Sequence, residues 1–327
     1  MRDSRLDNAK GVLIFLVVFG HFVEAAGGWS NPLFGVILTG IYMFHMPAFI
    51  FLAGMTARSE GLGQRIATLV ILLFSFQALY LLVVTLKVGD YSGSWLQPYW
   101  LLWFLLSLIW WSTFLPVIKR IPFALGISAL IAVAAGSISA IGYALSSART
   151  LVFLPFFVAG VLFGRPLYAN LRVSGAKRYF ALLLIPALAS GLHAYGVTNF
   201  WYYGSFRFDQ LQVDDATGWA TRGVLISAAA IASLAFFVAL PHHETVFSKA
   251  GRNSLSVFLL HGFCVITLGP SITGLVKQAG PWLGIGVLLS ASALLVAVLS
   301  ADFLDTAIRR SANALYGWWA KVVRCFI

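Results

Sequence analysis

Long apolar runs alternate with short polar connections along the whole chain. Crossing a membrane takes about 20 apolar residues in a helix, because each residue adds only about 1.5 Å. We expect ten such helices, at residues 9–26, 33–55, 66–87, 99–117, 122–144, 150–165, 179–197, 218–240, 253–270 and 281–304. The pattern therefore predicts an all-α integral membrane protein, with residues 1–327 forming a single membrane domain.

Both ends of the chain differ from these runs. The start, "MRDSRLDNAK", is polar and leads into the first run without a small-residue cleavage pattern, so we expect a retained first span. The end, "RRSANALYGWWAKVVRCFI" (309–327), places tryptophans beside basic residues. This mixture predicts a short amphipathic C-terminal tail that lies in the membrane interface.

The charged residues orient the predicted helices. Only 10% of the residues are charged and 60% are hydrophobic, while the 22 lysines and arginines give a net charge of +11. If the N-terminus is cytoplasmic, the basic residues outside the cytoplasm are Lys87, Arg149, Arg207, Arg222 and Lys277. The majority then face the cytoplasm, as the positive-inside rule requires, so we expect both termini on that side. No basic tract suited to a nucleic acid is present, and the expected surroundings are membrane lipids.

Three histidines lie inside predicted helices. His21 follows Lys10 by eleven positions, or roughly 16 Å of helix. His45 lies near the middle of the second run, and His261 lies within the ninth. Ionisable groups at this depth commonly mark function, although a histidine can also bridge two helices structurally. Three histidines at a similar depth favour a shared functional site.

Glu24 lies one helical turn beyond His21 and projects from the same face. A carboxylate there predicts a hydrogen bond that holds one imidazole nitrogen and makes the other more basic, as general-base catalysis needs. The alternative is that Glu24 only reaches the outer surface at the end of the helix.

Two predicted external loops, 88–100 and 198–219, combine tryptophan and tyrosine with aspartate. Aromatic faces stack on sugar rings, so Trp100, at the end of the first loop, and Trp103, just beyond it, are candidates for a sugar-binding mouth. An aromatic belt at the membrane surface is the alternative explanation.

The segment "SKAGRNSLS" (248–256) is a candidate anion site on the cytoplasmic side. Asn253 and Ser254 fall at a predicted helix start, where free N–H groups favour an anion, and Arg252 precedes them. Lys10 and Arg58 are further basic residues that could bind phosphate. An ordinary helix cap accounts for the same pattern without a ligand.

Several segments resemble the acyltransferase 3 family of integral membrane acyltransferases. "LDNAKGVLIFLVVFGH" (6–21) matches the family's basic residue, ten intervening residues and histidine, with lysine in place of the more familiar arginine. "FHMPAFIFLAG" (44–54) resembles the pattern of the second span. Later signature segments follow in order at 99–111, 154–164 and 251–261. The resemblance is greatest to the fucose 4-O-acetylase-like branch, which O-acetylates bacterial surface sugars.

This resemblance implies an O-acyltransferase of the bacterial inner membrane. It would transfer an acyl group, most simply acetyl from cytoplasmic acetyl-CoA, to a hydroxyl of an envelope glycan or lipid-linked sugar, without a metal. His21 is implied as base or acyl carrier, assisted by Glu24 and His45. The implied donor residues are Lys10, Arg58, Arg252, Asn253 and Ser254, and the implied acceptor residues are Trp100, Trp103 and His261.

A proton-coupled transporter is the main alternative, because it would also contain buried histidine and glutamate in bent helices. The sequence shows no internal repeat of the kind many transporters have. An enzyme of lipid or isoprenoid chemistry would need an acidic metal cluster, yet the close pair Asp214 and Asp215 lies in a predicted external loop. A structural scaffold leaves the buried histidines unexplained.

Overall fold

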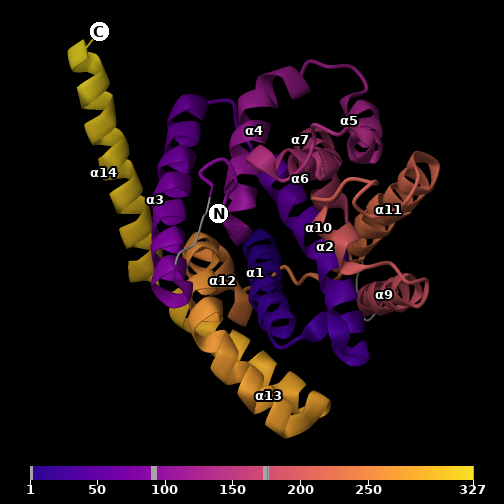
Figure 1. The fold of residues 1–327 in the computed structure, drawn as a ribbon. Helices are drawn as coiled ribbons and strands as arrows, with labels where there is room; N and C mark the ends of the chain where they lie inside the picture. The colour runs from indigo at the N-terminus through magenta and orange to yellow at the C-terminus, as the bar shows by residue number, and fades with distance from the viewer. Residues whose placement is uncertain (1–2, 90–93, 172–174, 176, 327) are drawn as a thin grey trace.

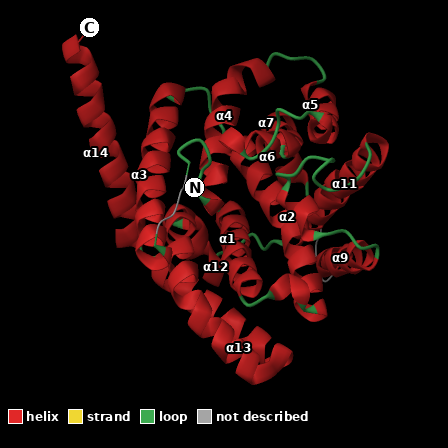
Figure 2. Ribbon diagram, in the orientation of Figure 1, coloured by secondary structure: helices red, strands yellow, loops and turns green. Residues whose placement is uncertain are grey.

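A computed structural model describes residues 3–326 with the exception of 90–93, 172–174 and 176 (Figure 1). All regular secondary structure in these residues is helical (Figure 2). The α-helices are α1 (Ser4–Ala25), α2 (Pro32–Thr56), α3 (Leu62–Val88), α4 (Trp103–Ile118), α5 (Ala124–Ala134), α6 (Ser147–Val152), α7 (Leu154–Asn170), α8 (Lys177–Phe180), α9 (Leu184–Ala194), α10 (Asn199–Tyr203), α11 (Asp215–Ala239), α12 (Val246–Arg252), α13 (Ser254–Leu299) and α14 (Asp302–Phe326). Short 3₁₀ turns cover Gly28–Ser30, Trp100–Leu102, Ala135–Ser137, Ala144–Ser146 and Ala181–Leu183.

Six of the described helices are long and apolar enough to cross a membrane, or seven if the bent pair of α6 and α7 forms one span. The all-helical multi-pass architecture is therefore confirmed, whereas the count of ten is not. The runs at 122–144 and 179–197 give only α5 and α9, each of 11 residues. The run at 150–165 falls in a pair of helices bent by 53°. Hydropathy reports the apolar length of a segment, and turns inside an apolar segment shorten its helix.

Helix α13 contains the two runs that we expected as separate spans at 253–270 and 281–304. A straight helix of 46 residues would be roughly 70 Å long, so its ends would be far apart. Instead, the Ser256 hydroxyl donates to the Leu299 carbonyl at 2.7 Å, at the other end of the helix. The chain turns at Gly280, directly before Pro281. The φ of Gly280 is 77°, a value that glycine adopts readily because it has no side chain. The helix is thus two antiparallel legs.

Helices α1 and α2, which carry His21 and His45, lie at the centre of the molecule (Figure 1). Glycines allow their neighbours to approach closely. A Cβ atom on Gly251 of α12 would overlap the carbonyl of Asp7, and one on Gly160 of α7 would overlap the carbonyl of Phe51. Small residues at helix crossings are typical of membrane proteins, since they let the backbones pack against each other.

The N-terminus is anchored by Arg5, which is only 3% exposed. Its guanidinium donates to the carbonyls of Tyr168, Leu171 and Phe237. These carbonyls lie at the ends of α7 and α11, where backbone acceptors lack partners within the helix. The first helix is thereby tied to two others.

The predicted tail is helical and begins earlier than expected. Helix α14 starts at Asp302 and runs along α3 (Figure 1). Its Trp318 and Trp319 are exposed. The tenth predicted run correspondingly ends at Leu299, before position 304.

Two of the arginines that we counted on the external side of the membrane lie in helices. Arg222 belongs to α11, is 2% exposed, and has its guanidinium 5.4 Å from the rings of both Trp201 and Phe208. Arg149 belongs to α6 and faces the central cavity described below. Neither arginine lies in a loop between helices.

Candidate active site

A cavity of about 540 Å³ lies between α1, α2, α4, α6, α10 and α13. Most of its wall is aromatic or aliphatic. Five of the predicted site residues line it: His21, Glu24, His45, Trp100 and Trp103. The helix packing thus brings together residues from three separate segments of the chain.

His21 is paired with His261. Nδ1 of His21 lies 3.0 Å from Nε2 of His261, and the two rings are stacked with their centroids 5.2 Å apart. His261 is fully buried behind His21, so the expectation that it lines the acceptor path is wrong. It backs the first histidine instead.

A third group, the carbonyl of Val257, determines which nitrogens of the two histidines carry hydrogen. Nδ1 of His261 lies 2.9 Å from the carbonyl oxygen of Val257. A carbonyl can only accept, so this Nδ1 carries the hydrogen, and a neutral His261 then has a lone pair on Nε2. Nδ1 of His21 must donate to that lone pair. Nε2 of neutral His21 is therefore left as an acceptor, which is the state that a general base requires.

His45 is held in the same way. Its Nδ1 lies 2.7 Å from the carbonyl of Ile41 in the preceding turn of α2. By the same reasoning Nδ1 carries the hydrogen, and Nε2 of the neutral ring is an acceptor. His45 lines the same cavity as His21, which places a second basic nitrogen at the site.

Glu24 contacts aromatic residues and does not hold His21. The Tyr42 hydroxyl donates to Oε2 at 2.6 Å, while the Trp29 indole, at 3.1 Å, and the Tyr203 hydroxyl both donate to Oε1. The expected hydrogen bond from Glu24 to His21 is therefore wrong, because His261 occupies that position. Glu24 still lines the cavity, at the end nearest the connection between α1 and α2.

Three cavity residues were missed by the sequence reasoning: Tyr42, Tyr203 and Arg149. Tyr42 precedes His45 by three positions, so helical spacing alone would have placed it on the same face. Arg149 donates from Nε to the Tyr203 carbonyl at 3.1 Å, and its guanidinium lies 5.2 Å from the Trp103 ring. No local signal distinguishes it from a loop cation.

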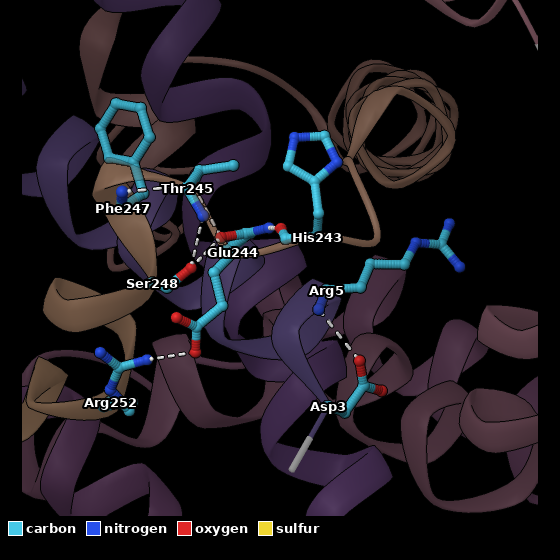
Figure 3. A network of polar contacts seen from close by, with 9 residues as sticks. Asp3, Arg5, His243, Glu244, Thr245, Phe247, Ser248 and Arg252 are labelled. Atoms are coloured by element: carbon cyan, nitrogen blue, oxygen red, sulfur yellow. Dashed lines mark hydrogen bonds and ion pairs between the residues drawn. The ribbon is translucent and has the colours of Figure 1, made fainter. Parts of the chain in front are cut away.

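The predicted anion site at "SKAGRNSLS" is a joint between helices. The Asn253 amide donates to the Ser300 carbonyl at 2.8 Å and to the Asp302 carboxylate at 2.6 Å, so it is not open to an anion and does not cap α13. Arg252 forms an ion pair with Glu244 at 3.0 Å (Figure 3). Ser254 begins α13 and Lys10 lies on α1, both half-buried.

Arg58 lies in a different setting, just beyond the end of α2. Together with Arg165 it lines two neighbouring cavities of about 460 and 590 Å³. Tyr168 and His242 face the first, and Lys119 faces the second. The basic side chains outnumber the acidic ones, Asp3 and Glu60, and form a basic cluster toward the N-terminal end of α1. Among the described residues, no group of three His, Cys, Asp or Glu side chains is arranged to hold a metal.

Comparison with known proteins places the chain in a family. A family model described as an acyltransferase domain, Acyl_transf_3, matches residues 3–302. The nodulation protein NolL of Sinorhizobium fredii is 31% identical over 130 residues, which cover 32% of this chain and 34% of that protein. NolL of Mesorhizobium japonicum is 28% identical over 209 residues, or 56% of this chain and 54% of that protein.

The alignments thus span about a third and about half of the length of these relatives. No solved structure matches the chain. The family match, by contrast, extends over nearly the whole chain, from α1 to the start of α14. This protein belongs to the acyltransferase 3 family.

Proposed function

We propose that this protein is a membrane-bound O-acyltransferase of the bacterial inner membrane. It transfers an acyl group, most simply acetyl from cytoplasmic acetyl-CoA, to a hydroxyl of a cell-envelope carbohydrate or lipid-linked sugar. The observation that carries this proposal is His21, whose Nε2 is left as an acceptor at a cavity wall by the hydrogen bond to His261. Family membership supports the reaction type.

His21 is well suited to move the proton of the reaction. Nε2 accepts the proton of the acceptor hydroxyl as the oxygen attacks the thioester carbonyl. When the tetrahedral intermediate collapses, the carbon–sulfur bond breaks and Nε2–H returns the proton to the departing CoA sulfur. Throughout, Nδ1–H keeps its hydrogen bond to His261, which holds the ring in place. In the alternative order, the same Nε2 attacks the thioester carbonyl, the carbon–sulfur bond breaks and CoA leaves as the thiolate. The acceptor hydroxyl then attacks the acyl group, the carbon–nitrogen bond breaks, and the hydroxyl proton neutralises the thiolate.

The two substrates approach from opposite ends of α1 in this proposal. We place both termini in the cytoplasm and retain ten membrane crossings, two of them made by the short helices α5 and α9. The donor phosphates then bind at the cluster of Arg58 and Arg165, because guanidinium groups match phosphate oxygens in pairs. Lys10 and Arg252, on the same side, add positive charge near the entrance. The acceptor enters from the end where Glu24 lies.

The test measures acetyl-CoA binding by calorimetry and acetyl transfer by the purified protein in detergent. His21→Ala should bind acetyl-CoA like the wild type and lose transfer by at least about a hundredfold, the usual contribution of a general base. Arg58→Ala should weaken binding about tenfold or more, since a hydrogen bond to a charged group contributes about 1.5–3 kcal/mol. His193→Ala, on α9 away from the cavity, is the matched control and should change neither.

Transfer at the wild-type rate by His21→Ala would contradict the assigned role of this residue. A well-folded wild-type protein that does not bind acetyl-CoA would contradict the acyltransferase function itself. That result would favour the alternative of a proton-coupled transporter, which uses the same buried histidines differently.

A further inference from the structure

We propose that a second cavity beside the central one binds another sugar ring of the acceptor, so that the protein acylates a sugar within an oligosaccharide or glycoconjugate. This inference rests on the proposed function. The second cavity has a volume of about 340 Å³, within the range of small-molecule sites.

The two cavities have a common wall. Tyr99, Trp100, Tyr143 and Arg149 line both of them. The Trp100 ring lies 4.5 Å from the His21 ring, centroid to centroid, so this wall is directly beside the proposed base. A molecule larger than one ring that reaches His21 can therefore extend past Trp100 and Arg149 into the second cavity.

Besides Leu81, Pro98 and Gly142, five polar side chains line only the second cavity. They carry amide or hydroxyl groups: Gln77, Ser94, Gln97, Ser146 and Ser205. Groups that donate and accept hydrogen bonds, combined with an aromatic wall, suit a ring that has an apolar face and hydroxyls at its edge.

Gln77 holds part of this wall in position. Its Oε1 accepts from the backbone N–H of Tyr99 at 2.7 Å, and its Nε2 donates to the carbonyl of Gln97 at 3.3 Å. Trp100, which follows Tyr99, has a φ of 37°, and Ser146 in the same cavity wall has a φ of 53°. Such conformations are unfavourable for residues with a side chain, and they gather at sites where the fold must aim a group.

Arg149 can reach ligands in both cavities. Nε donates to the Tyr203 carbonyl, and Nη2 lies 3.5 Å from the Ser205 hydroxyl. Nη1 makes no hydrogen bond to any described residue. The guanidinium lies near the rings of Trp103, at 5.2 Å, and Tyr143, at 5.4 Å, which fix its plane. Its remaining N–H groups are available to hydroxyls of two adjacent rings.

The test compares the binding of single-ring methyl glycosides with the binding of disaccharides. Calorimetry in detergent would use methyl glycosides of common envelope hexoses and N-acetylhexosamines, and the disaccharides built from them. At least one disaccharide should bind the wild type about tenfold or more tightly than either of its methyl glycosides. Equal binding of disaccharides and methyl glycosides, or no saccharide binding, would overturn the inference.

Gly142→Leu is designed to fill the second cavity. Gly142 lines this cavity and not the central one, and a Cβ atom there meets no other atom within 4 Å. The disaccharide should lose its advantage over the methyl glycoside. Ser205→Ala, which removes a hydroxyl without adding volume, should reduce the advantage in the same direction. Gly126→Leu on α5, where the space is equally open, is the control and should bind like the wild type.

The outcome separates this inference from the proposed function. If the disaccharide binds preferentially but is not acetylated with acetyl-CoA present, the cavity assignment stands and the proposed function fails. If mono- and disaccharides are acetylated with equal kcat/KM, the function stands and the second cavity is not an acceptor site.

Discussion

At the scale of single residues, the chemistry depends on which nitrogen of each histidine carries the hydrogen. The carbonyl of Val257 determines this for His261, and His261 in turn determines it for His21. A neutral imidazole thus takes the orienting position that a carboxylate holds in many catalytic triads. Glu24 was the natural candidate for that position, because it lies on the same helix face one turn away.

His261 is therefore a positioning residue, and its substitution should lower kcat with little change in KM. We expect His261→Ala to reduce kcat about tenfold to a hundredfold, since His21 loses the partner that selects its tautomer. His261→Gln should recover part of this loss, because the Gln amide oxygen can accept from Nδ1 of His21. Steady-state kinetics on both variants measure the effect. Equal losses for Ala and Gln would indicate a packing role only.

Asn8, within the first signature segment, has a structural role. The Asn8 amide donates to the carbonyls of Pro241 and His243, and its oxygen accepts from the hydroxyls of Thr245 and Ser248. It thereby fastens the start of α12 to α1, next to the Thr245–Ser248 capping box (Figure 3). Part of the "LDNAK" motif is accounted for by this joint, without a ligand.

At the scale of helices, close crossings set the position of the site. Gly11 of α1 and Gly251 of α12 face each other's backbones, with no room for a side chain at either position. The N-terminal half of α1 is held there, and His21 lies further along the same rigid helix. Helix lengths were less predictable than helix positions, as α5, α9 and the folded-back α13 show.

Gly251→Ala should destabilise the protein, because the added Cβ would overlap the Asp7 carbonyl. We expect a loss of about 1–3 kcal/mol or more, the range for overpacked sites, visible as a lower melting temperature in detergent. Gly274→Ala in α13 is the matched control, since a Cβ there meets nothing within 4 Å. Alanine in an open helical position should be neutral or stabilising by about 0.5–1 kcal/mol. Equal melting temperatures for the two variants would contradict the close crossing.

At the scale of the whole molecule, the cavities follow the length of α1. The basic cavities of Arg58 and Arg165 lie toward its N-terminal end, and the histidine cavity lies toward its C-terminal end. This order suits an enzyme whose donor and acceptor come from opposite sides of a membrane. It also makes the orientation of the chain a strict requirement of the proposed function.

Labelling of single cysteines with a membrane-impermeant maleimide tests that orientation. In a background without the native cysteines, Gln210→Cys should react in intact spheroplasts, because the 198–219 segment faces outward in our topology. Glu60→Cys, next to Arg58, should react only after the membrane is permeabilised. Both positions are exposed, so access depends on the side of the membrane. The reverse pattern would place the basic cluster outside and remove the route for a cytoplasmic donor.

The sequence by itself determined the class of the protein and most of its chemical groups. Apolar runs act locally, since each must form a helix to satisfy its own backbone in lipid. The all-helical membrane fold, the three buried histidines and the family resemblance could therefore all be read from single segments. The structure places His21, His45, Trp100 and Trp103 around one cavity, and their roles there stay predictions.

Only the tertiary structure decided which groups touch. His261 meets His21 across 240 positions of sequence, and Tyr203 meets Glu24 across 179. Arg149 reaches the cavity because α6 and α7 bend, and Asn253 is engaged because α13 folds back on itself. These contacts depend on how the helices cross, and hydropathy and helical spacing describe only one helix at a time.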